Sequence, residues 1–147
     1  MHDQQKPGRV AVLGGAGGIG RVLVASLQAK GNEVIVLDLA ASLDRHALAA
    51  TGIAIDVCDE QSVTAAFAEL GEQWDSIDGF VNLAGYNSDL KPIGDTTAGY
   101  FDEITGGNLR GAFLAAKYAA PLMKAARKGS IVLTSSTAGL YGYPPRA

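Results

Sequence analysis

The segment Val10-Ala11-Val12-Leu13-Gly14-Gly15-Ala16-Gly17-Gly18-Ile19-Gly20 joins an apolar run, a glycine-rich turn and the start of a helical pattern. Val10 to Leu13 does not alternate between apolar and polar residues, which predicts a strand buried on both faces of a parallel sheet. The glycines allow a sharp turn and the close approach of a ligand to the backbone. A helix from about Ile19 to Ala29 would direct its free N–H groups and its positive dipole end at the turn. The segment therefore predicts a phosphate or pyrophosphate site.

The glycines of this turn fit three spacings. Gly15-x-Gly17-x-x-Gly20 is the general dinucleotide-binding fingerprint. Gly14-x-x-Gly17-x-x-Gly20 and Gly14-x-x-x-Gly18-x-Gly20 fit two related patterns equally well. A tight turn between a strand and a helix can show such spacings without binding a ligand. Motifs elsewhere in the chain are therefore needed to decide whether the turn binds a ligand and which spacing applies.

Composition limits the classes of protein to which the chain can belong. The 147 residues are 48% hydrophobic and carry a net charge of −3 without a basic cluster, which argues against a nucleic-acid partner. The single cysteine, Cys58, excludes an internal disulfide and is expected to be a small buried side chain. Residues 1–8 are expected to form a flexible tail without a signal peptide, and no apolar stretch is long enough to span a membrane. We therefore expect a cytoplasmic protein with one domain over residues 9–147, no membrane contact and no metal site.

Apolar strand patterns and helical patterns alternate five times along the chain. This alternation predicts an α/β fold, a doubly wound parallel sheet of about five strands with helices on both faces. Met123, Phe67, Phe80 and Phe113 are expected in its core. The predicted strands are Val10–Leu13, Glu33–Leu37, Thr51–Ile55, Ile77–Leu83 and Ile131–Thr134. The predicted helices are Ile19–Ala29, Ser42–Ala50 with Ser42 as N-cap, one capped by Asp59 and ending near Gly71, one from Thr96 or Thr97 to Ile104, and a long one from Asn108 to Gly129.

An acid ends the second predicted strand. Asp38 lies 18 residues after Gly20, near the spacing of the acid that binds the adenosine ribose hydroxyls in dinucleotide-binding folds. A negative charge there would repel a 2′-phosphate, and neither Leu39 nor Ala40 is basic, so NAD is favoured over NADP. Arg45 is the nearby base that could reverse this preference. The alternative is that Asp38 is only a solvated acid at a strand end.

Five motifs in order together resemble the short-chain dehydrogenase/reductase family, in its single-domain branch. They are the glycine turn read as Gly14-x-x-x-Gly18-x-Gly20, the pair Asp56-Val57, the signature Asn82-Leu83-Ala84-Gly85, the run Asn108-Leu109-Arg110-Gly111-Ala112-Phe113, and Ser136. Extended nucleotide-sugar epimerases, which fit the Gly14-x-x-Gly17-x-x-Gly20 spacing, usually lack the Asn82 signature. The resemblance runs from Arg9 to the end of the chain and implies a Rossmann-like fold that is incomplete relative to the family.

The resemblance also implies roles for individual residues. Gly14, Gly18, Ile19 and Gly20 would place the pyrophosphate on the first helix, Asp38 would hold the ribose, Asp56 and Val57 would bracket the adenine, and Asn82, Ala84 and Gly85 would line the cofactor. Ser136 would hydrogen-bond the substrate oxygen, and Asn108 would hold a water in a proton relay; the alternatives are a strand-end hydroxyl and a helix N-cap. The implied function is NAD(P)-dependent hydride transfer between the nicotinamide and a small alcohol or ketone. The alternative is a non-catalytic NAD(H)-binding module or a truncated inactive homologue.

The family's acid–base pair, Tyr-x-x-x-Lys, would fall at positions 149 and 153, beyond Ala147. We therefore expect this chain to bind cofactor and to perform hydride chemistry poorly or not at all, whether it is a fragment or a truncated product. Ile131–Thr134 would form an exposed apolar edge that favours association. The full-length protein is expected to be a homo-oligomer.

Overall fold

The sheet has five parallel strands. The computed structural model describes residues 7–46, 49–86, 91–137 and 140–141. Within them the strand order is β3-β2-β1-β4-β5. The second and third strands therefore lie on one side of β1, and the fourth and fifth lie on its other side. This confirms the predicted parallel sheet and places a topological switch point between β1 and β4. The strands are β1 (Arg9–Leu13), β2 (Glu33–Asp38), β3 (Thr51–Ala54), β4 (Gly79–Asn82) and β5 (Ser130–Leu133).

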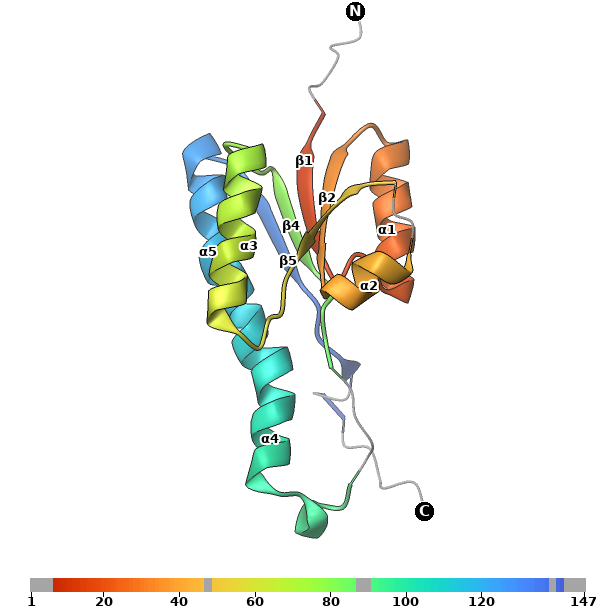
Figure 1. Cartoon of the computed structure of the whole chain (residues 1–147), viewed down its shortest axis with the longest axis vertical. Helices are drawn as coiled ribbons and strands as arrows, with labels where there is room; N and C mark the ends of the chain where they lie inside the picture. The colour runs from red at the N-terminus through yellow and green to blue at the C-terminus, as the bar shows by residue number, and fades with distance from the viewer. Residues whose placement is uncertain (1–6, 47–48, 87–90, 138–139, 142–147) are drawn as a thin grey trace, which may run out of the picture.

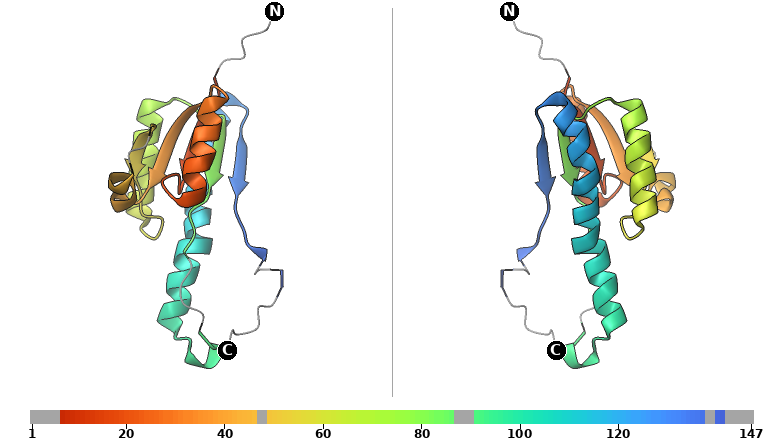
Figure 2. Two further views of the ribbon diagram at one scale, coloured as in Figure 1. Left: turned by 90° about the vertical axis from the view of Figure 1, so that its right-hand side faces the viewer. Right: turned by 90° about the vertical axis from the view of Figure 1, so that its left-hand side faces the viewer.

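Helices cover both faces of the sheet, as predicted (Figure 1). On one face lie α1 (Gly18–Ala29) and the short α2 (Ala40–Arg45). On the other face lie α3 (Glu60–Gln73) and α5 (Gly111–Ala126), side by side (Figure 2). A further helix, α4 (Ala98–Thr105), projects beyond the carboxyl ends of the strands.

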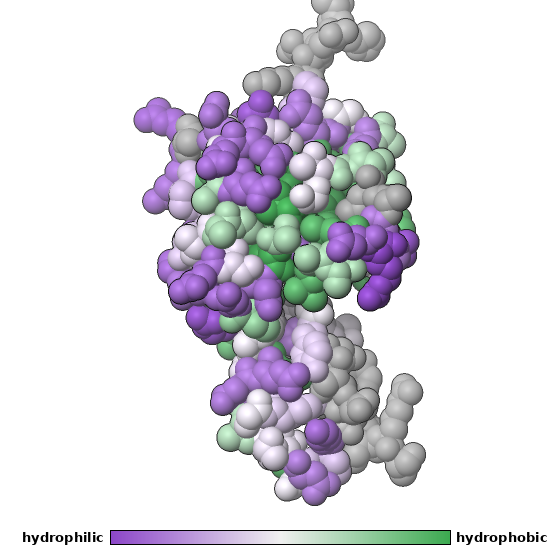
Figure 3. All heavy atoms as spheres, viewed as in Figure 1, coloured by the Kyte–Doolittle hydropathy of each residue, from purple (hydrophilic) through white to green (hydrophobic). Residues whose placement is uncertain are grey.

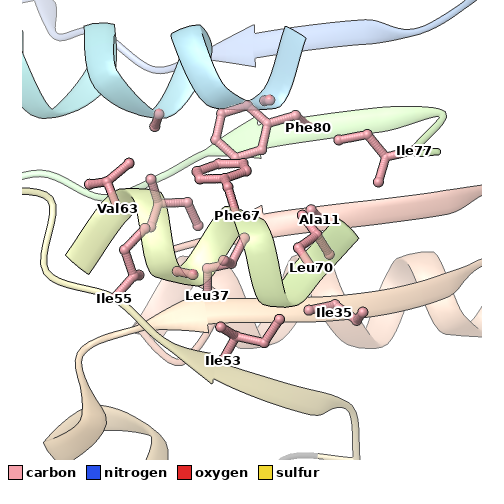
Figure 4. Packing of buried hydrophobic residues seen from close by; sticks show 14 of the residues in the cluster. Ala11, Ile35, Leu37, Ile53, Ile55, Val63, Phe67, Leu70, Ile77 and Phe80 are labelled. Atoms are coloured by element: carbon pink, nitrogen blue, oxygen red, sulfur yellow. The ribbon is translucent and has the colours of Figure 1, made fainter. Parts of the chain in front are cut away.

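Two apolar layers hold these helices to the sheet. The larger one lies under α3 and α5, where the rings of Phe67 and Phe80 meet edge to face with centroids 5.8 Å apart (Figure 4). The smaller one lies under α1 and includes Val12, Val24 and Val36. Both layers draw on β1, because successive residues of a strand point to opposite faces. Figure 3 looks at the β3 edge, where apolar residues reach the surface between the hydrophilic outer sides of the helices.

The two helices predicted on either side of Gly106 and Gly107 form one continuous run. The predicted start at Thr96 or Thr97 is confirmed: Thr97 is the N-cap of α4, and its hydroxyl accepts a hydrogen bond from the N–H of Tyr100. A π-helical turn, Gly106–Arg110, then joins α4 to α5 without a break. The prediction that Asn108 begins a separate helix, or caps one, is therefore wrong. The reason is that the backbone of Gly106 takes ordinary right-handed helical angles (φ −58°, ψ −53°) and continues the helix, and the following Gly107 lies in contact range of Tyr86 and Cys58.

Four further predictions need correction. The second helix begins at Ala40, directly after β2, because the N–H groups of Ser42 and Leu43 both donate to the carbonyl of Leu39; Ser42 is not its N-cap. The helix capped by Asp59 runs past Gly71 to Gln73. The long helix α5 ends at Ala126 rather than at Gly129, because the next residue, Arg127, takes the left-handed conformation (φ 55°). Phe113 is 62% exposed because it points away from the sheet, to which its neighbour Leu114 contributes instead. Predictions on residues 1–6, 47–48, 87–90 and 142–147 lie outside the described residues.

The edge strand β5 is exposed, as predicted. Ile131, Val132 and Leu133 are 40%, 47% and 50% exposed, although β5 pairs along its whole length with β4. Both faces of this strand therefore present apolar side chains to solvent. Among the described residues, no helix is both long and apolar enough to cross a lipid bilayer.

Candidate dinucleotide site

The turn between β1 and α1 requires glycine at two positions for the fold itself. Gly14 has φ 78°, and a Cβ built on it would lie 2.7 Å from the backbone nitrogen of Ala84. A Cβ on Gly20 would overlap the carbonyl oxygen of Gly14 and lie 2.6 Å from the Cα of Gly15. These two glycines therefore let the first turn of α1 pack directly on the β1 and β4 loops.

Gly18 is different, because a Cβ there would meet no heavy atom within 4 Å. It is the first residue of α1, whose initial N–H groups have no partner within the helix. In the described part of the chain, no side chain caps this helix and no acid lies in its first turn. The space beside Gly18 is thus open, and this end of α1 carries the positive end of the helix dipole, which suits an anion.

The carboxylate of Asp38, at the end of β2, is fixed against the glycine turn. Its Oδ2 accepts a hydrogen bond of 2.9 Å from the N–H of Ala16, and its Oδ1 accepts one of 2.8 Å from the N–H of Leu39. These two bonds orient the carboxylate without neutralising it. The turn and the acid are therefore parts of one site.

A pocket of about 370 Å³ extends from this turn along the carboxyl ends of the strands. Ligands of open α/β sheets bind at this end of the strands, beside the switch point. The pocket brings together six of the predicted cofactor residues, namely Gly14, Asp38, Asp56, Val57, Ala84 and Gly85. Of the other predicted cofactor residues, Gly18, Ile19 and Gly20 form the helix end beside it, and Asn82 lies behind it.

The pocket wall after β3 is a tight turn. Oδ1 of Asp56 accepts a 2.9 Å hydrogen bond from the N–H of Cys58. Cys58 was expected to be buried, but it is exposed and lines the pocket. The pKa of its thiol is raised, first by partial desolvation of the sulfur and next by the neighbouring carboxylate of Asp56.

The wall after β4 is held by two asparagines. Asn82 is only 3% exposed, and its Oδ1 accepts a 2.9 Å hydrogen bond from the N–H of Ala84, which shapes the turn into the pocket. Asn108 holds the next residues: its Oδ1 accepts from the N–H of Tyr86 (2.9 Å), and its Nδ2 donates to the carbonyls of Tyr86 (2.8 Å) and Ile104 (2.9 Å). In this structure Asn108 therefore ties the π-helical turn to the β4 loop.

Ser136, the other predicted catalytic residue, follows β5 and is exposed. Among the described residues that line the pocket, Ser136 does not appear. The pocket does include residues that sequence reasoning missed: Leu39, Cys58, Glu103 and Gly107. Leu39 was detectable from its place next to Asp38, but Glu103 of α4 and Gly107 of the following π-helical turn reach the pocket through tertiary packing and carry no sequence signal.

The chain is similar to known dehydrogenases and reductases. Residues 14–147 match a family described as enoyl-(acyl carrier protein) reductase. The chain is 33% identical to 2-(S)-hydroxypropyl-CoM dehydrogenase 3 of Xanthobacter autotrophicus over 100% of its own length and 60% of the relative's. It is 36% identical to D-xylose 1-dehydrogenase of Caulobacter vibrioides, covering 90% of this chain and 54% of that one. The crystal structure of levodione reductase superposes with a TM-score of 0.82 at 30% identity, over 92% of this chain and 56% of the other.

The chain belongs to the short-chain dehydrogenase/reductase family. Its fold is the Rossmann-like fold of that family, and its relatives are dehydrogenases and reductases. It spans somewhat more than half the length of the curated relatives that it matches.

Proposed function

We propose that the chain is the cofactor-binding part of an NAD-dependent oxidoreductase that transfers hydride between the nicotinamide and a small alcohol or ketone. The observation that carries this proposal is the shared pocket of Gly14 and Asp38, in which the acid is held 2.9 Å from the backbone of the glycine turn. An open helix N-terminus next to an oriented carboxylate fits a diphosphate next to a ribose diol. On this proposal residues 9–147 form one dinucleotide-binding domain.

NAD is favoured over NADP by charge. A 2′-phosphate oxygen about 4 Å from the carboxylate of Asp38 would be repelled by about 1 to 4 kcal/mol, depending on how well water screens the pair. Among the described residues that line the pocket, none is basic and could offset this repulsion. A preference of about fivefold or more for NAD follows.

The bound cofactor supplies or accepts the hydride, and the chain's own residues bind and orient. The N–H groups at the start of α1 would hold the diphosphate, and Asp56 and Val57 would border the adenine. Ser136 would donate a hydrogen bond to the substrate oxygen, where negative charge develops as hydride reaches a ketone carbon or, in the reverse direction, as the alcohol loses its proton. The substrate is a small molecule, in keeping with the dehydrogenases that the chain resembles, and a full-length form would be a homo-oligomer.

Equilibrium titration with NAD⁺ and NADP⁺ tests the proposal. The wild-type chain should bind NAD⁺ more tightly, and Asp38→Asn should reduce the ratio of the two dissociation constants by about tenfold. Asp44→Asn is the matched control, because Asp44 is an exposed acid of α2 outside the pocket and its loss changes net charge by the same amount. Failure of the wild-type chain to bind either dinucleotide would contradict the proposal.

A further inference from the structure

The π-helical turn Gly106–Arg110 contacts both walls of the pocket. A Cβ built on Gly107 would lie 3.4 Å from the Cβ of Tyr86 on one side and 3.7 Å from the Sγ of Cys58 on the other. Asn108 holds the Tyr86 side through the hydrogen bonds described above. The opposite wall is the turn Asp56–Cys58, which also accepts a hydrogen bond from the same helical turn.

Arg110 supplies this contact. Its Nη1 donates a 3.1 Å hydrogen bond to the carbonyl oxygen of Cys58, two residues after Asp56. Its Nη2 lies 3.3 Å from Oε2 of Glu60, in the first turn of α3. One guanidinium therefore bridges the end of the pocket wall and the start of the helix that follows it.

Glu60 is itself held from the other side. Its Oε1 accepts hydrogen bonds from Nζ of Lys117 (3.0 Å) and from the hydroxyl of Tyr118 (3.2 Å), both on α5. The hydrogen bond from Lys117 is the largest cause of the lowered pKa of Glu60, so the carboxylate facing Arg110 stays ionised. Lys117 and Arg110 thus each form an ion pair with Glu60, through different carboxylate oxygens. Of the two, Arg110 also donates a hydrogen bond to the carbonyl oxygen of Cys58.

Close packing leaves the turn little room to move away from Arg110. A Cβ on Gly111, the residue after Arg110, would lie 2.9 Å from the side chain of Val57. The start of α5 therefore packs directly against the pocket wall. Loss of the hydrogen bond from Arg110 to Cys58 should shift the positions of Asp56 and Val57 as well.

We propose that Arg110 is a positioning residue for the turn Asp56–Cys58 and so for the adenine end of the cofactor pocket. The expected effect of Arg110 on cofactor affinity rests on the proposed function. On this account, one helical turn sets both walls of the pocket, the β4 wall through Asn108 and the β3 wall through Arg110.

Binding of nucleotide halves tests the proposal against a general loss of stability. In Arg110→Met, the dissociation constants of NAD⁺ and AMP should rise by the same factor, about 3- to 10-fold, as expected for the loss of one partly exposed hydrogen bond. Lys117→Met is the matched control, since it removes an ion pair with Glu60 but leaves the bond to Cys58; its constants should stay within about twofold of wild type. Arg110→Lys, which keeps a donor, should recover part of the lost affinity.

Amide hydrogen exchange without nucleotide supplies the second measurement. The N–H groups of Cys58 and Asp59 bond to the side chain and the carbonyl of Asp56, so their exchange rates report on this turn. Exchange should be faster in Arg110→Met and unchanged in Lys117→Met. Equal effects of the two variants on AMP binding, or unchanged exchange in Arg110→Met, would overturn the inference. A wild-type chain that binds neither NAD⁺ nor AMP would instead contradict the proposed function, while exchange would still decide whether Arg110 holds the turn.

Discussion

Substitution of Gly20 by alanine tests how the glycine turn is built. The new Cβ would overlap the carbonyl oxygen of Gly14 and lie 2.6 Å from the Cα of Gly15, well inside the 3.4 Å at which ordinary contact begins. Both neighbours are backbone atoms, so no side chain can rotate away. Gly14 itself lies against the backbone of Ala84, which prevents the turn from retreating toward the sheet.

The expected cost follows from these contacts. Overpacking against backbone destabilises by about 1 to 3 kcal/mol, and the gain in helix propensity offsets up to about 1 kcal/mol of that cost. A net loss of about 2 kcal/mol corresponds to a fall in melting temperature of roughly 4 to 8 °C for a domain of this size. Affinity for NAD⁺ should fall as well, because the displaced turn carries the N–H groups that would hold the diphosphate.

Gly18→Ala is the control for this substitution. No heavy atom lies within 4 Å of the added Cβ, so its free energy of unfolding should equal that of wild type or rise by about 0.4 to 1 kcal/mol. Thermal unfolding followed by circular dichroism compares the three proteins. A Gly20→Ala protein as stable as the Gly18→Ala protein would refute the reasoning.

Three other perturbations have defined outcomes. Phe80→Ala should lower the free energy of unfolding by about 3 to 5 kcal/mol in urea titrations, because Phe80 is fully buried in the larger core layer; a loss below 1 kcal/mol would show that this layer is not packed as described. The raised pKa of Cys58, due to partial desolvation and then Asp56, predicts slow alkylation by iodoacetamide at pH 7 that accelerates above pH 9, and NAD⁺ should slow it further; rapid labelling at pH 7 or labelling indifferent to NAD⁺ would be contrary results. The lowered pKa of Glu60, due first to its hydrogen bond from Lys117, means that its contribution to stability is complete above the ordinary value of 4.5 and is lost as pH falls through the lowered value. The stability difference between wild type and Glu60→Gln should therefore shrink between pH 5 and pH 3, and a constant difference would contradict this assignment.

The strands and the glycine turn were predictable because each is set by local sequence. The apolar run Val10–Leu13 and the glycines after it act through neighbouring backbone, and the alternation of strand and helix patterns fixes a parallel sheet. Asp38 was predictable for the same reason, since a strand end and a fixed spacing place it beside the turn.

The features that were missed depend on contacts between distant segments. Gly106 and Gly107 suggest a helix break when read alone, yet both continue one helical run, in which Gly107 lies beside Cys58 and Tyr86. The exposure of Cys58 likewise depends on which segments pack around the turn after β3, and no local pattern encodes it. The bridge from Arg110 to Cys58 spans 52 positions in sequence and could not be inferred from either end.

Hydrogen exchange with and without saturating NAD⁺ tests the central claim, that this pocket holds a dinucleotide. We expect slower exchange in two separate segments, Gly14–Gly20 and Asp56–Cys58, with little change in the edge strand β5. Binding that protects neither segment, or the absence of any protection by NAD⁺, would contradict it.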